Sequence, residues 1–147
     1  MFKKIILLLI FCFFSSQLHA EKFKLKKIVP LDEPWGSSFI NENEIIITEK
    51  KGKIKLININ SREIFEINHD LNFKVYGQGG LLDIIYKKNF LWISYSEDRG
   101  DWKTSTSIAK ADFNRKNLSF KNIFQANPPI DSGYHFGSRL VIKDNYL

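Results

Sequence analysis

Three stretches of this chain share one layout, in which a glycine is followed by a short apolar run, a polar turn and a second apolar run. Superposing them on Gly36, Gly80 and Gly137 gives spacings of 44 and 57 residues. One four-stranded blade of a β-propeller takes roughly 40 to 50 residues. A β-sandwich is not expected to repeat the same strand–turn–strand pattern at that interval. The repeat therefore predicts an all-β fold of the β-propeller class.

Strand signals fill the three repeats. Short runs rich in Ile, Phe, Tyr and Val alternate with Asn, Gly, Asp and Lys clusters, and no convincing amphipathic helix follows residue 21. Strands are expected at residues 37–40, 44–49, 53–59 and 62–67, then at 81–86, 90–96, 106–113 and 118–125, and finally at 138–142. Residues 23–31 are expected to form an edge strand. The chain thus holds about two blades and the start of a third.

A propeller needs at least about four blades to close. Residues 21–147 are therefore expected to be the N-terminal part of a longer propeller that is truncated at the C-terminus. The first residues, by contrast, have the order of a secretory signal peptide, because Lys3 and Lys4 precede an apolar run over residues 5–14 and a polar stretch that ends at Ala20. That run is about half the roughly 20 residues that span a bilayer.

We therefore expect residues 1–20 to be a signal peptide cleaved after Ala20, with an uncleaved anchor as the alternative. The mature protein is expected to be periplasmic or secreted, without stable membrane insertion. It would contain no cysteine, because Cys12 lies inside the signal peptide. A nucleic-acid partner is not expected either, since the lysines behind the net charge of +6 are spread along the chain rather than gathered on one element.

Candidate functional residues precede the expected first strands of the second and third repeats. On the glycine alignment Pro34, Gln78 and His135 share one position, and such positions converge at one mouth of a propeller channel. An imidazole there can accept a proton at neutral pH, which makes His135 the candidate catalytic residue; the alternative is a histidine bonded to a neighbouring loop. Gln78 could orient a ligand, or satisfy its own turn. Tyr134 could stack on a ligand, or simply pack.

Two further features are interpreted without assigning a metal ligand. Arg139 is expected to pair with a neighbouring blade more readily than with a substrate. The loop over residues 97–105 is expected to be solvated. Its acids at positions 97, 98 and 101 leave calcium as a minority interpretation, because their spacing is not that of a calcium-binding loop.

Several segments together resemble a known family. Pro34-Trp35-Gly36, the run from Gly77 to Asp83 (GQGGLLD) and the run from His135 to Leu140 (HFGSRL) occur in the order and spacing of the aldose sugar dehydrogenases that depend on pyrroloquinoline quinone (PQQ), the soluble glucose/sorbosone dehydrogenase family. The mature chain is similar to this family over nearly all of its length.

The resemblance implies an exported six-bladed propeller that binds PQQ and calcium and oxidises an aldose sugar at C1 to the lactone, with hydride transfer to PQQ. His135 then corresponds to the base that takes the C1 hydroxyl proton, and Gln78 to a residue lining the sugar and quinone pocket. Tyr134 is a departure, since some members carry an acid at this position.

The family's other PQQ contacts and its calcium ligands come from later blades, so the chain alone is expected to be inactive. Two alternatives remain open at this point. One is a non-catalytic propeller that binds a glycan or a protein partner, and the other is a calcium-dependent lactonase-like propeller.

Overall fold

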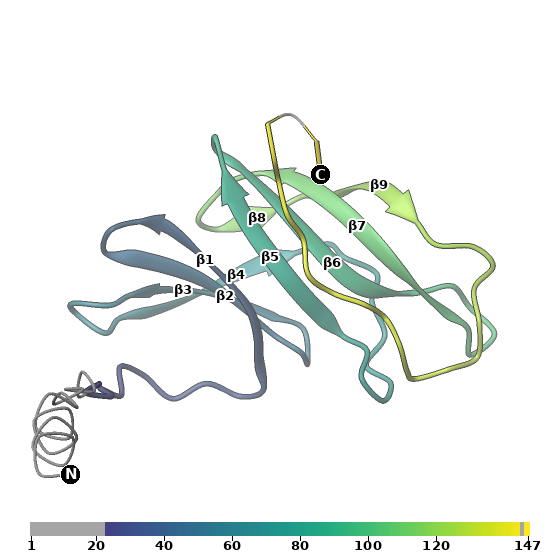
Figure 1. Ribbon diagram of the computed structural model, residues 1–147, viewed down its shortest axis with the longest axis horizontal. Coiled ribbons are helices and arrows are strands. Elements are labelled where there is room, and N and C mark those ends of the chain that lie inside the picture. Colours follow the sequence, from purple (N-terminus) through teal and green to yellow (C-terminus); the bar gives the residue numbers. More distant parts are fainter. Residues whose placement is uncertain (1–22, 145) are drawn as a thin grey trace, which may run out of the picture.

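The computed structural model describes residues 23–144, 146 and 147, so the predicted signal peptide lies outside the described residues. All regular elements of the described part are β-strands (Figure 1): β1 Pro34–Asn41, β2 Glu44–Glu49, β3 Lys53–Asn58, β4 Ile64–His69, β5 Leu81–Lys87, β6 Phe90–Asp98, β7 Thr104–Asp112, β8 Asn117–Leu118 and β9 Lys121–Gln125. The predicted all-β fold is confirmed. Among these residues there is no helix with the length and apolarity that a bilayer crossing requires.

The first sheet has the strand order β1-β2-β3-β4-β8, and its first four strands form an antiparallel meander. The β-branched run of β2 suits a pleated strand, and alternation sends its side chains to opposite faces. Ile46 and Thr48 are fully buried against the second sheet, whereas Ile45 and Ile47 face the other way and are only partly buried. Gly52, with φ of 107°, makes the turn into β3.

The second sheet has the order β5-β6-β7-β9. The predicted single strand over residues 118–125 is wrong, because the structure divides it in two. β8 pairs in parallel with β4 of the first sheet, and β9 pairs with β7. The cause is Asp70, whose carboxylate accepts hydrogen bonds from the Ser119 hydroxyl at 2.6 Å and the Phe120 N–H at 2.8 Å. Leu118 is consequently buried beside the first sheet.

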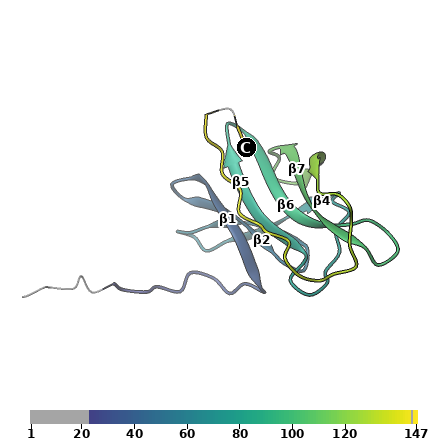
Figure 2. The ribbon, with the colours of Figure 1, turned by 45° about the vertical axis from the view of Figure 1, so that its right-hand side comes forward.

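The core lies between the two sheets. The first sheet contributes Ile46, Ile54, Leu56 and Ile67, and the second contributes Leu81, Ile84, Leu91 and Ile93, all with at most 1% exposure. Burying an aliphatic side chain of this size contributes about 1.5 to 3 kcal/mol. β1 and β5 lie next to each other in both views (Figures 1 and 2). Gly36 permits this approach, because a Cβ there would lie only 2.6 Å from the Cα of Asp83.

The same irregularity interrupts the first strand pair of each sheet, and it shows how the repeats correspond. Pro34 lies opposite Glu49 and Ser37 opposite Ile47, while Leu81 lies opposite Tyr95 and Ile84 opposite Ile93. Each bulge thus places three steps of one strand against two steps of its partner. Superposing the two bulges puts Pro34 on Leu81, Gly36 on Asp83 and Thr48 on Ser94.

The glycine-based alignment is therefore wrong: Gly36 corresponds to Asp83 and not to Gly80, and Pro34 does not share a position with Gln78. The physical reason is the bulge. The bulge fixes, through backbone geometry, which residues of the two paired strands lie opposite each other. The three glycines, by contrast, occupy three different structural settings and do not mark equivalent positions.

Two other predicted strands are absent from the described residues. Residues 23–31 form no strand, because side chains such as Phe23 and Leu25 have no surface to pack against and are 89% and 97% exposed. Residues 138–142 run beside β5 in both views without a backbone ladder (Figures 1 and 2). Their backbone groups bond to side chains of the second sheet instead, so the expected third-repeat strand is also wrong as a regular element.

Candidate functional site

The loop before β5 and the loop before residues 138–142 meet at one end of the sheets. Gln78 joins them twice: its N–H donates to the Gly133 carbonyl at 2.7 Å, and its Oε1 accepts from the His135 N–H at 3.1 Å. Gly77 allows this contact, because its φ is 57° and a Cβ there would clash with the Gly133 carbonyl. The predicted proximity of Gln78 and His135 is confirmed.

The His135 backbone is held while its side chain faces solvent. Its φ of 65° lies in the left-handed region, which is uncommon for a residue other than glycine. The next residue, Phe136, is buried, and its carbonyl accepts a hydrogen bond from the Thr106 hydroxyl. Tyr134 is 61% exposed, and its ring centroid lies 6.4 Å from that of His135. The arrangement presents an imidazole and a phenol ring from a fixed loop.

Buried hydroxyls that the sequence reasoning missed connect the repeats. Thr48 accepts from the Gly36 N–H at 3.0 Å and donates to the Leu82 carbonyl at 2.5 Å. At the corresponding position, Ser94 accepts from the N–H of Asp83 at 3.0 Å and donates to the Ser138 carbonyl at 2.6 Å. Each hydroxyl thus ties the first strand of its own repeat to the first segment of the next. We call this arrangement the hydroxyl clasp.

Asp83 adds a second connection to the third repeat. The residue is 2% exposed, and its carboxylate accepts from the Leu140 N–H at 2.8 Å and pairs with Arg139 at 3.3 Å. The expected pairing of Arg139 with a neighbouring repeat is confirmed. The signal that could have revealed Asp83 is a lone acid inside the apolar run of β5, since a buried charge requires partners.

The acidic loop differs from its prediction. β6 continues through Asp98 and β7 begins at Thr104, so the connection is shorter than residues 97–105. Glu97 is 9% exposed and accepts hydrogen bonds from Ser107, Asn122 and Gln125. Its carboxylate therefore belongs to the interior of the second sheet and not to a solvated loop. Within the part of the chain that the structure describes, no three His, Cys, Asp or Glu side chains are grouped as metal ligands would be.

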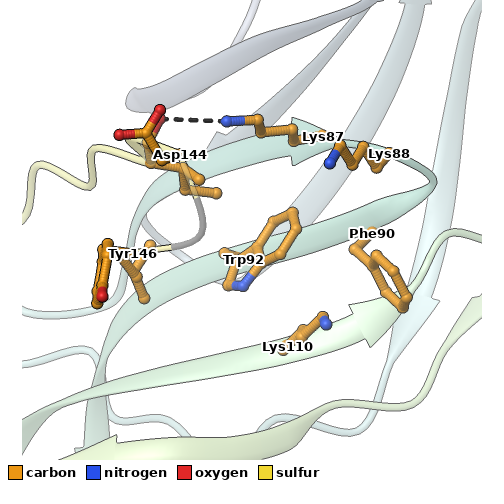
Figure 3. Close-up of a pocket in the computed structure, with 9 residues that line it drawn as sticks. Lys87, Lys88, Phe90, Trp92, Lys110, Asp144 and Tyr146 are labelled. Carbon is orange, nitrogen blue, oxygen red and sulfur yellow. Dashed lines mark hydrogen bonds between the residues drawn. The ribbon is translucent and has the colours of Figure 1, made fainter.

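A pocket lies at the opposite end of β5 from Gln78 (Figure 3). Lys87 and Lys88, where β5 ends, line it together with Trp92 of β6, and the Lys110 ammonium lies 3.6 Å from the ring centroid of Phe90. Lys87 also donates to the carbonyl of Ile142. This pocket belongs to the packing between the second sheet and the segment beyond residue 137, and it contains none of the predicted site residues.

Two four-stranded antiparallel arrangements, β1 to β4 and β5-β6-β7-β9, meet along their first strands and repeat one hydroxyl clasp, which defines consecutive blades of a β-propeller. The sequence model described as Glucose / Sorbosone dehydrogenase matches residues 31–147. The chain therefore belongs to the glucose/sorbosone dehydrogenase family, and the predicted resemblance is confirmed.

Named relatives agree with this assignment. The aldose sugar dehydrogenase YliI of Escherichia coli (strain K12) is 31% identical in an alignment of 120 residues that covers 76% of this chain and 32% of the relative. The crystal structure of the soluble aldose sugar dehydrogenase from Escherichia coli in the apo-form has a TM-score of 0.70 at 28% identity, over 76% of this chain and 35% of that chain.

A PQQ-bound aldose sugar dehydrogenase from Streptomyces coelicolor shares the fold, with a TM-score of 0.62 at 14% identity over 71% of this chain and 34% of that chain. The chain thus spans about a third of the length of the relatives it matches. The predicted propeller class is confirmed, and the described sheets correspond to part of the propeller.

Proposed function

We propose that this chain is the N-terminal part of a periplasmic quinoprotein that oxidises aldose sugars at C1 to lactones, with hydride transfer to PQQ. The observation that carries the proposal is the solvent-facing imidazole of His135 on a loop whose backbone is held by Gln78. The proposed substrate, an aldose sugar, and the proposed cofactor, PQQ, are suggested by the family and by the names of the relatives.

In this proposal His135 is the catalytic base. An imidazole nitrogen takes the proton of the C1 hydroxyl as the C1 hydride leaves, so that the carbon becomes a carbonyl carbon and the proton remains on the protein. Gln78 and Tyr134 bind the substrate or cofactor beside it. PQQ, when bound, supplies the hydride acceptor. The protein's own task is to position the sugar and to hold the proton.

The residues present fit one edge of such a site. His135, Gln78 and Tyr134 are exposed together on the two loops that Gln78 joins. We place the remaining PQQ contacts and the calcium ligands in residues outside this chain, consistent with the share of the relatives that it spans. The 147-residue chain alone is therefore expected to be inactive.

The test uses the product of the complete reading frame that contains this chain, supplied with PQQ and calcium. We expect aldose-dependent reduction of an artificial dye, and its loss in His135→Ala. His69→Gln is the matched control, because His69 bonds to the Gly52 carbonyl inside the first sheet and takes no part in the site. A wild-type product without PQQ-dependent dye reduction would overturn the proposal, and lactone opening without quinone would favour the lactonase-like alternative.

Export is tested separately. The mass of the mature protein recovered from the periplasm or the medium should correspond to a chain that begins at Glu21. A cytoplasmic product that retains Met1 would contradict the proposed location. Dye reduction by the 147-residue chain itself would contradict its proposed inactivity.

A further inference from the structure

Three hydroxyls lie in a row on one face of the second sheet. Ser94 of β6 lies directly opposite Ile108 of β7, and opposed side chains of a sheet share a face. Thr104 and Thr106 join that face, because side chains two residues apart in a strand point the same way and both lie an even number of residues before Ile108. We call Ser94, Thr104 and Thr106 the hydroxyl row.

Each member of the row donates to a backbone carbonyl of residues 130–138. The bonds run from Thr104 Oγ1 to Ser132 at 3.1 Å, from Thr106 Oγ1 to Phe136 at 2.5 Å and from Ser94 Oγ to Ser138 at 2.6 Å. A carbonyl oxygen can only accept a hydrogen bond, so each hydroxyl has to donate. The row thus holds one carbonyl before His135 and two after it.

These bonds hold the segment where it has no strand ladder. Ile130 still exchanges two backbone hydrogen bonds with Thr104, at 2.9 and 3.0 Å. Residues 131–142, all of which the structure describes, form neither a strand nor a bridge. Side-chain hydroxyls therefore fix the loop that carries His135 against the second sheet.

The geometry points to Thr106 and Thr104 as positioning residues for His135. A residue other than glycine at φ of 65° is kept there by its surroundings. Gln78 bonds to the N–H of His135, whereas Thr106 bonds to the carbonyl of the residue that follows. The two contacts therefore hold the backbone on opposite sides of the His135 Cα, and the imidazole projects from a fixed point.

Neither threonine needs to contact a ligand for this role. Thr104 is fully buried and Thr106 is partly buried, and both hydroxyls are committed to the loop. They act on the reaction through the backbone of His135. The effect on catalysis rests on the proposed function, whereas the hold on the loop does not.

Two substitutions at one position isolate the hydroxyl. Thr106→Val keeps the shape of the side chain and removes the donor, and Thr106→Ser keeps the donor. Ser119→Ala is the matched control, because it removes a hydroxyl that donates to the Asp70 carboxylate at 2.6 Å and makes no contact with the loop. Thr104→Val gives the same readouts if Thr106→Val does not fold.

The first measurement is amide hydrogen exchange in the 147-residue chain, residue by residue. The reporters are the N–H groups of Tyr134 and His135, which are both hydrogen-bonded in the loop. We expect Thr106→Val to speed their exchange about 2- to 13-fold, the range that one net hydrogen bond gives. Thr106→Ser and Ser119→Ala should leave both rates within about twofold. Unchanged rates in Thr106→Val, or equal rates in the valine and serine variants, overturn the positioning role.

The second measurement uses the product of the complete reading frame with PQQ and calcium, and kcat is calculated per bound PQQ so that unfolded protein does not count. We expect Thr106→Val to lower kcat about 2- to 13-fold while the KM for the aldose stays within about twofold, because the base and not the binding of the sugar is disturbed. Thr106→Ser should restore kcat. An unchanged kcat in Thr106→Val, or a change confined to KM, contradicts the effect on catalysis. An inactive wild type would overturn the proposed function instead, and would leave the exchange result standing.

Discussion

The hydroxyl clasp of Thr48 makes a quantitative prediction about how the blades hold together. Thr48→Val keeps the shape of the side chain and removes the hydroxyl that bonds to the Gly36 N–H and the Leu82 carbonyl. These groups are buried, and each buried group that loses its partner costs about 1 to 3 kcal/mol. We therefore expect a loss of about 2 to 6 kcal/mol in the free energy of unfolding, a large share of the about 5 to 15 kcal/mol typical of a domain.

Thr48→Ser is the matched control, because it keeps the hydroxyl and removes one methyl group, at a cost of about 1 kcal/mol. Urea unfolding followed by circular dichroism measures both variants, and the comparison is valid if the dependence on urea concentration stays the same. A valine variant as stable as the serine variant would refute the reasoning. Ser94→Ala leaves the buried Asp83 N–H without its acceptor, so it should cost about 1 to 3 kcal/mol in the same urea assay.

Three further predictions follow from named contacts. Gly36→Ala places a Cβ 2.6 Å from the Asp83 backbone, which cannot rotate aside, and should destabilise the chain by about 1 to 3 kcal/mol in the same urea assay. The hydrogen bonds from Arg115, and then from Asn41, lower the pKa of Glu44 from 4.5 to about 2. A folded-state pKa below the unfolded one stabilises the folded state at higher pH, so this contribution is present above pH 4.5 and is lost as the pH falls towards 2. It is smaller in Arg115→Gln, which keeps only the Asn41 hydrogen bond, and equal acid sensitivity of the two proteins would contradict it. Phe39→Lys, on the outward apolar face of the first sheet, should reduce self-association in analytical ultracentrifugation, and a monomeric wild type would contradict that expectation.

Much of the fold could be predicted because strands with one buried face carry an alternating pattern. The β-branched run at 45–48 and the apolar run at 81–86 predicted β2 and β5 nearly at their observed bounds. The repeat length then predicted blades, and the family-like segments predicted the family. The meeting of Gln78 and His135 was predicted correctly even though the alignment behind it was wrong, because both residues lie in loops that lead to the same end of the sheets.

The remaining features depend on contacts that leave no periodic trace. A bulge between Pro34 and Ser37 shifts the register without changing the apolar pattern. The split of the strand after Leu118 depends on Asp70, which lies far away in the sequence. A hydroxyl such as that of Thr48 looks in the sequence like any strand residue, and only the distance to another strand's carbonyl shows that it connects two blades.

Gly36 and Asp83 occupy one position in successive blades, and neither can stand in for the other. An aspartate at 36 would collide with the backbone of β5, and a glycine at 83 would leave the Leu140 N–H and the Arg139 guanidinium without their carboxylate. The blades of this protein are therefore not exchangeable modules. A propeller engineered by duplicating either blade, or by averaging the two into a consensus repeat, would fail first at this position, and each junction has to be designed together with the blade that follows it.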